Sequence, residues 1–231
     1  MGEQTTITTA DGSFSAYLAR PAETPKAAVV VIQEIFGVNA VMREITDGLA
    51  AQGFLAICPD LFWRIEPGID ITDQTDAEWQ KAFGLFNAFD VDAGVKDIAA
   101  TIASIRQDPG SKGKVGAVGF CLGGLLAYLT ATRTDADASV AYYGVGIDGR
   151  LGEADKLTHP LLMHIAEEDG FVSKEAQATI IGALKGDKLV DIFTYPGRDH
   201  GFARTGGQHY DAGDAALAGQ RTLDFFRKHL G

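Results

Sequence analysis

The first candidate for chemistry is Cys121, in the segment Gly-Phe-Cys-Leu-Gly-Gly that covers residues 119–124. An apolar run precedes it and a helix-compatible stretch begins at Leu122, so the cysteine lies where a strand turns into a helix. Flanking glycines permit the tight turn that exposes a nucleophile, and a helix N-terminus favours a thiolate and offers free amides. The pattern predicts a thiol nucleophile, with the Leu122 amide as the first oxyanion donor. In the alternative interpretation, Cys121 is a small apolar residue that only packs.

A thiol nucleophile needs a base within hydrogen-bond distance and an acid that orients the base. Of the five histidines, His200 is the best placed, because it follows the last predicted strand and precedes the final predicted helix. Asp169 is the preferred acid because it comes directly after a buried strand; Glu167 and Glu168 are weaker candidates. Cys121, Asp169 and His200 then follow the order of nucleophile, acid and histidine in α/β-hydrolases.

A second carboxylate, Glu34, follows the apolar run over residues 27–32. At the same sheet edge as Cys121, its charge would disfavour the thiolate and keep the resting thiol protonated. Alternatively, Glu34 anchors its loop by pairing with an arginine, and these two roles are compatible. The Ile35 amide in the same loop is the expected second oxyanion donor.

Positioning these residues requires strands whose ends meet at one edge of a sheet. Short apolar runs alternate along the chain with segments of helical periodicity. Strands are expected over residues 5–9, 14–19, 27–32, 55–58, 114–119, 139–143, 161–165 and 190–195. Helices are expected over residues 41–52, 77–87, 91–106, 122–132, 174–184 and 215–229.

This order predicts an α/β fold, a mostly parallel sheet with helices on both faces. Asp11-Gly12 predicts a turn between the first two strands, which would form an antiparallel edge hairpin. At 231 residues, a single domain over residues 1–231 is expected. The loop over residues 60–76 is a candidate lid or pocket wall.

The composition of the chain limits the classes of partner that it can bind. A formal net charge of −11 and a pI near 4.8 disfavour nucleic acid and anionic membranes. No apolar stretch approaches the length of a membrane span, and residues 1–6 lack the features of a secretory signal, which predicts a cytoplasmic protein. Cys58 and Cys121 suggest no disulfide, and Cys58 is expected to pack in the core. We expect a monomer that binds a small molecule.

The chain resembles the dienelactone hydrolase (carboxymethylenebutenolidase) family along nearly its whole length. The segments that carry the resemblance cover residues 33–40, 58–61, 88–90, 116–124, 142–146 and 200–204. The resemblance implies an α/β-hydrolase fold. It also implies hydrolysis of the enol ester of a dienelactone to maleylacetate, with neither a metal nor a cofactor.

By position, the resemblance assigns Cys121 as nucleophile, His200 as base and Asp169 as orienting acid. It implies that Glu34 contacts the resting thiol, and that Arg204 pairs with Glu34 and recognises a substrate carboxylate. In the implied switch, the substrate anion engages Arg204 and frees Glu34 to take the thiol proton. The thiolate then attacks the lactone carbonyl.

One part of the family pattern is missing. The family's enzyme for dienelactone has a second carboxylate-binding arginine where this chain has Trp79, and a tyrosine where it has Phe83. Lys81 and Arg198 are candidates to supply the missing charge, although each is also explained as an ordinary solvated residue. The sequence therefore leaves the substrate open between an anionic lactone and a more apolar ester or a thioester.

Two other classes of function compete. Residues 144–149 read Gly-Val-Gly-Ile-Asp-Gly, a nucleotide-binding pattern that must open a helix. Residues 150–160 contain Gly152 and few apolar side chains, which disfavours this interpretation. A redox sensor or binding protein that uses Cys121 is the other alternative, and it does not need a histidine and an aspartate as well.

Overall fold

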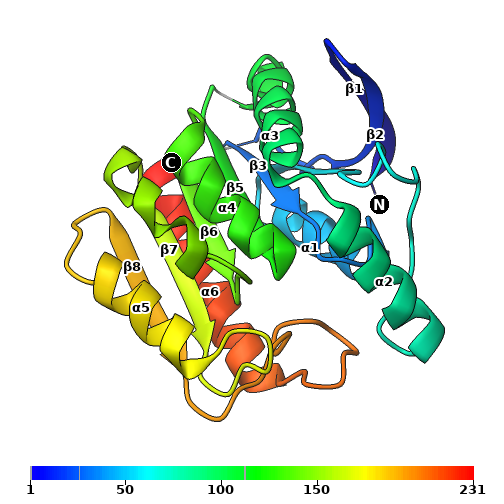
Figure 1. The fold of residues 1–231 in the computed structure, drawn as a ribbon. Coiled ribbons are helices and arrows are strands. Elements are labelled where there is room, and N and C mark those ends of the chain that lie inside the picture. Colours follow the sequence, from blue (N-terminus) through cyan, green and yellow to red (C-terminus); the bar gives the residue numbers. More distant parts are fainter. Residues whose placement is uncertain (1, 26, 112) are drawn as a thin grey trace.

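One eight-stranded sheet organises the computed structural model, which describes residues 2–25, 27–111 and 113–231 (Figure 1). Met1, part of the amino-terminal segment considered above, lies outside them. The strand order is β1-β2-β4-β3-β5-β6-β7-β8, and the strands from β3 to β8 are parallel. The strands are β1 (Glu3–Thr9), β2 (Gly12–Ala19), β3 (Ala28–Ile32), β4 (Leu55–Pro59), β5 (Val115–Phe120), β6 (Ala138–Tyr142), β7 (Leu161–Ala166) and β8 (Val190–Tyr195).

The amino-terminal strands form the predicted edge hairpin. β1 pairs with β2 in antiparallel register, and β2 pairs with β4, also antiparallel. The turn that Asp11-Gly12 predicts covers Ala10 and Asp11 in the structure, and Gly12 is the first residue of β2. Gly12 has a φ of 147°, in the region that favours glycine. The predicted α/β fold, with a parallel sheet and an antiparallel edge, is confirmed.

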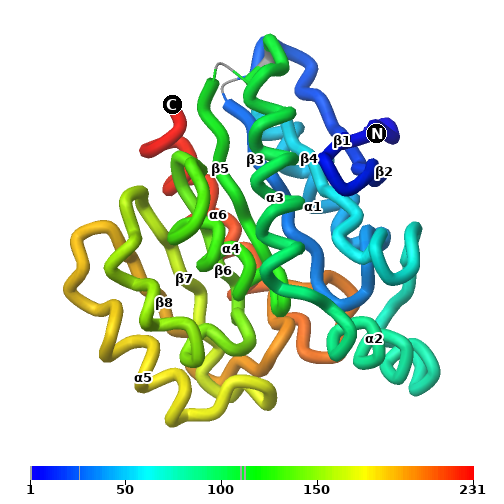
Figure 2. The backbone as a smooth tube through the Cα atoms, turned by 45° about the horizontal axis from the view of Figure 1, so that its top comes forward, coloured from blue at the N-terminus to red at the C-terminus, as the bar shows by residue number. Residues whose placement is uncertain are grey.

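Helices cover both faces of the sheet, as Figures 1 and 2 show. One face carries α1 (Ala40–Ala51) and α6 (Ala212–Leu230), and the other carries α3 (Val91–Arg106), α4 (Leu122–Arg133) and α5 (Lys174–Leu184). The remaining helix, α2 (Asp76–Ala88), lies beyond the carboxyl ends of the strands. Two 3₁₀ helices, η1 (Pro109–Ser111) and η2 (Asp148–Lys156), complete the elements. No helix in the described ranges has the length and apolar character that crossing a bilayer requires.

Capping side chains explain two helix starts that precede the predicted ones. α6 begins at Ala212 because the Asp211 carboxylate accepts a hydrogen bond from the Asp214 amide at 2.9 Å. α2 begins at Asp76 because the Thr75 hydroxyl accepts from the Glu78 amide at 3.2 Å and donates to its carboxylate at 2.8 Å. Both caps precede the first residue of apolar periodicity, so periodicity alone places these starts too late.

The central strands are the core of the molecule. Every residue of β3 to β7 is buried, as expected for parallel strands covered on both faces. Cys58 in β4 has no exposed surface, and burial raises the pKa of its thiol. Its predicted role in core packing is confirmed. Cys58 and Cys121 are both free thiols.

Gly123 allows α4 to approach β3. A Cβ atom at this position would lie 2.4 Å from the carbonyl oxygen of Ile32 and 2.6 Å from that of Gln33. We expect Gly123→Ala to lower the free energy of unfolding by about 1–3 kcal/mol, because backbone atoms cannot move aside as a side chain could.

Urea unfolding tests this expectation. The control is Gly182→Ala in α5, where a new Cβ would meet nothing within 4 Å. The control should raise the free energy of unfolding by up to about 1 kcal/mol, because alanine is the better helix former. A Gly123→Ala protein as stable as the wild type would show that the helix can shift at no cost.

Candidate active site

Cys121 lies in a strained turn between β5 and α4. Its φ of 58° and ψ of −116° are unusual for a residue with a side chain, and Tyr143 is the only other non-glycine residue with positive φ in the described ranges. The turn is tight, because a Cβ at Gly119 would lie 1.9 Å from the carbonyl oxygen of Gly123. The geometry is that of a nucleophile elbow, which presents one side chain at the carboxyl edge of the sheet.

His200 and Asp169 form a buried hydrogen-bonded pair. Asp169 follows β7 and His200 follows β8, so two parallel neighbours bring them to the same edge. The Nδ1 atom of His200 lies 3.1 and 3.0 Å from the two carboxylate oxygens of Asp169. The amides of Phe171 and Val172 donate to the same carboxylate at 2.8 and 3.1 Å and fix its orientation.

Asp199, the neighbour of His200, has a different role. Its carboxylate accepts hydrogen bonds from the Gly170 amide at 2.8 Å and from the His200 amide at 2.6 Å. It therefore joins the loop after β7 to the loop after β8. Asp199 is thus a loop cap, and among the described residues its carboxylate has no hydrogen bond to the His200 ring.

The free nitrogen of His200 is placed for proton transfer. Its Nε2 atom is buried and has no hydrogen-bond partner in the described part of the chain. Burial lowers the pKa of His200, but the charge of Cys121 and the hydrogen bond to Asp169 outweigh burial and raise this pKa to about 10. A thiolate at Cys121 thus favours a protonated His200, so the pair can exchange a proton.

Arg204 holds two carboxylates beside this pair. Its Nε and Nη2 atoms donate to Glu34 at 2.7 and 3.1 Å, and Nη1 donates to Asp73 at 2.8 Å. The alternative interpretation of Glu34, a loop anchor paired with an arginine, describes this contact. Among the described residues, no hydrogen bond joins Glu34 to Cys121, and the Glu34 carboxylate is bonded to Arg204 instead. Asp73 was not predicted.

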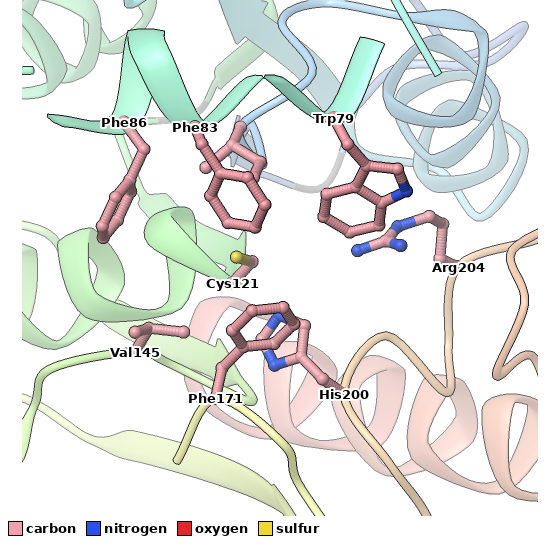
Figure 3. A pocket seen from close by; sticks show the side chains of 9 residues that line it. Trp79, Phe83, Phe86, Cys121, Val145, Phe171, His200 and Arg204 are labelled. Atoms are coloured by element: carbon pink, nitrogen blue, oxygen red, sulfur yellow. The ribbon is translucent and has the colours of Figure 1, made fainter. Parts of the chain in front are cut away.

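An apolar cavity opens over Cys121 (Figure 3). Its free volume, including the open mouth, is about 360 Å³. Its lining consists of Ile35, Trp79, Phe83, Phe86, Cys121, Val145, Phe171, His200 and Arg204. Trp79 and Phe83, which are expected from sequence to contact the substrate, therefore line the cavity, and their contact with substrate stays a prediction. Phe86, Val145 and Phe171 also line it and were not predicted.

Aromatic rings form two walls of the cavity. Trp79 and Phe83 on α2 stack with their centroids 5.4 Å apart. Phe171 stacks against Trp79 at 6.5 Å and meets the His200 ring edge to face at 4.8 Å. Phe171 follows Asp169-Gly170 at the end of a strand, and that position is the signal from which it could have been found.

Lys81 and Arg198 do not replace the missing arginine. Lys81 pairs with Glu66 at 2.8 Å and is 42% exposed, and it is absent from the cavity lining. Arg198 pairs with Asp211 and Asp214 beside α6 and is also absent from the lining. Their alternative interpretation as ordinary surface charges describes both.

Two backbone amides are available for an oxyanion. Leu122 is the first residue of α4, so its amide has no preceding turn of helix to bond with. The Ile35 amide has no hydrogen bond to another group in the described ranges, and Ile35 lines the cavity.

Within the described ranges, no three His, Cys, Asp or Glu side chains gather in a way that could hold a metal ion.

The candidate nucleotide-binding segment leads into a different element. Residues 144–149 follow β6 and run into η2, which is a 3₁₀ helix. A Cβ at Gly144 would lie 2.8 Å from the backbone of Gly124, so this glycine serves close packing against α4. The structure thus lacks, at this segment, the α-helix that such a fingerprint must open.

Comparison with known proteins places nearly the whole chain in one family. The sequence model of the dienelactone hydrolase family matches residues 14–230. The chain belongs to the dienelactone hydrolase family. A protein of Azospirillum brasilense, provisionally named carboxymethylenebutenolidase, is 52% identical over 96% of each chain. The carboxymethylenebutenolidase of Pseudomonas putida is 42% identical over 96% of this chain and 95% of its own.

The structural comparison agrees with this membership. A crystal structure from Klebsiella pneumoniae, provisionally described as a dienelactone hydrolase, superposes with a TM-score of 0.86 at 26% identity. The match covers 99% of this chain and 98% of the other. As a dienelactone hydrolase family member, the chain is a hydrolase that acts on ester bonds.

Proposed function

We propose that the protein hydrolyses small lactones or esters through a thiol acyl-enzyme formed on Cys121. The observation that carries the proposal is the unpartnered Nε2 of His200, buried beside a cysteine in a strained turn and aligned by Asp169. Membership of the dienelactone hydrolase family supports the reaction class.

The proposed reaction has two halves. His200 Nε2 takes the proton of the Cys121 thiol, and the sulfur attacks the ester carbonyl carbon. The resulting oxyanion accepts hydrogen bonds from the amides of Leu122 and Ile35. The C–O bond then breaks and the imidazolium returns the proton to the leaving oxygen, which leaves a thioester on Cys121. His200 next deprotonates a water molecule, which attacks the thioester carbonyl. The C–S bond then breaks, the carboxylic acid leaves, and the imidazolium returns its proton to the Cys121 sulfur.

The substrate is an ester or lactone small enough for the cavity. Relatives named carboxymethylenebutenolidase favour a dienelactone. In the switch that the family resemblance implies, its carboxylate would engage Arg204, and the released Glu34 would take the thiol proton in place of His200. The aromatic lining favours a second candidate, a more apolar ester, because Trp79 lines the cavity at the position where the family resemblance implies an arginine. A thioester would react by the same steps.

Intact-mass spectrometry tests the proposal. During turnover of p-nitrophenyl acetate or a dienelactone, we expect one acyl group on the protein, localised to Cys121 by peptide mapping. Hydroxylamine should release the adduct, because it cleaves thioesters. An adduct on another residue, or steady turnover with no acyl-enzyme after rapid acid quenching, would contradict the covalent route.

A further inference from the structure

We propose that Asp73 makes this site select substrates by their charge. By pairing with Arg204, it makes the enzyme prefer uncharged esters and lactones with a flat apolar part over those that carry a carboxylate. This inference rests on the proposed ester hydrolysis at Cys121. It concerns which ester is accepted, not how the ester is cleaved.

The charges around Arg204 disfavour an anionic substrate. Of the described residues that line the cavity, Arg204 is the only lysine or arginine. It already faces Glu34 and Asp73, so one positive charge meets two negative charges. The side chains of Arg204, Glu34 and Asp73 are 8%, 2% and 5% exposed, so water screens these charges weakly. A substrate carboxylate would enter as a third negative charge, which like-charge repulsion disfavours.

Asp73 is held in place by several contacts. Its backbone carbonyl accepts a hydrogen bond from Trp79 Nε1 at 2.9 Å, which connects it to the aromatic wall. Its neighbour Gln74 donates to the Asp73 carboxylate at 2.6 Å and to the carbonyl of Gly206 at 3.3 Å. An anion that displaced Asp73 would therefore disturb this loop and leave a buried carboxylate without its partner.

Arg204 is also constrained. Its guanidinium lies over the Phe36 ring, 4.9 Å from the centroid. The guanidinium also lies close to the backbone of Gly201. A Cβ atom at Gly201 would lie 3.1 Å from the guanidinium carbon of Arg204. The group cannot easily leave Glu34 and Asp73 to meet a new anion elsewhere in the cavity.

The rest of the cavity fits an uncharged, flat group. Figure 3 shows Trp79 and Phe83 on one side of Cys121 and Phe171 on the other. These faces offer stacking and apolar contact to a conjugated lactone ring or an aryl ester, and they offer no charge to a carboxylate.

The test compares two lactones that differ in one charge: a dienelactone with its free carboxylate, and the primary amide of the same acid. For the wild type, kcat/KM should favour the amide by at least about tenfold. In Asp73→Asn, which keeps the size and removes the charge, this preference should fall by about tenfold or more. Asp76→Asn is the matched control, because Asp76 is exposed in the first turn of α2. Its preference should stay within about twofold of the wild type, since water and salt screen that charge.

A wild-type preference for the carboxylate would overturn the inference without requiring any variant to fold. An Asp73→Asn protein that folds and keeps the wild-type preference would also overturn it, because Asp73 would then be only structural. Turnover of p-nitrophenyl acetate separates these results from failure of the proposed function. A protein that cleaves neither lactone nor this ester overturns both proposals.

Discussion

Replacing Cys121 by alanine should abolish ester hydrolysis, with a fall in kcat of about 10⁴-fold to 10⁶-fold. The proposed acyl-enzyme requires the sulfur, and His200 and the free amides cannot attack a carbonyl on their own. The fold should survive, because the substitution removes one sulfur atom from a residue that faces a cavity. Steady-state hydrolysis of p-nitrophenyl acetate, measured beside a urea unfolding curve, tests both expectations.

The other free cysteine provides the control. Cys58 is fully buried in β4, so Cys58→Ala should retain turnover even where it lowers stability. Loss of turnover in a folded Cys58→Ala protein, or retention of turnover in Cys121→Ala, would show that the nucleophile has been assigned to the wrong residue.

Cys121→Ala should also change the titration of His200. Its pKa is raised to about 10 partly by the charge of Cys121, so it should fall when that charge is removed. Because the folded pKa lies above the ordinary value of 6.5, protonation of His200 stabilises the fold fully below about pH 6.5. This contribution declines as pH rises towards about 10 and is lost above it. Ring-proton NMR across this range would detect the shift, and identical titrations in both proteins would mean that the two side chains do not interact.

The positions of the proposed catalytic groups could be predicted because they depend on local signals. Cys121 lies between glycines that only a tight turn explains, and Asp169 and His200 each follow an apolar strand. Parallel strands bring such ends to one edge, so the sheet converts sequence order into proximity. β7 is buried and pairs with β8 in parallel, so the loops that carry Asp169 and His200 leave the sheet side by side.

Asp73 could not be predicted in the same way. It lies in an irregular loop without periodicity, and its partner Arg204 is 131 residues further along the chain. The exclusion of Lys81 from the cavity, in contrast, follows from helix geometry. Trp79 and Phe83 are four residues apart and share a face of α2, whereas Lys81, two residues from each, lies on the other face.

Replacing Asp169 by asparagine should lower kcat by about 10³-fold to 10⁴-fold while the fold is kept. The amides of Phe171 and Val172 donate to one oxygen of this carboxylate, so the carbonyl oxygen of the variant side chain should stay with them. Its NH₂ group would then face His200 Nδ1 and donate to it. The imidazole would have to carry its proton on Nε2, where it could no longer accept the proton of Cys121.

Asp199→Asn is the matched control, because Asp199 also contacts the His200 loop. Its carboxylate accepts hydrogen bonds from the backbone amides of Gly170 and His200 and lies 3.4 Å from Nδ1 of His209. An amide oxygen can accept those two hydrogen bonds, so kcat should fall by less than about tenfold. Rates for both variants across pH separate positioning from chemistry. A wrong tautomer depresses kcat at every pH, whereas a loosened loop chiefly raises KM. If Asp169→Asn kept a wild-type kcat, the imidazole would be oriented by its packing against Phe171 and Tyr143, with ring centroids at 4.8 and 4.9 Å, and not by the carboxylate.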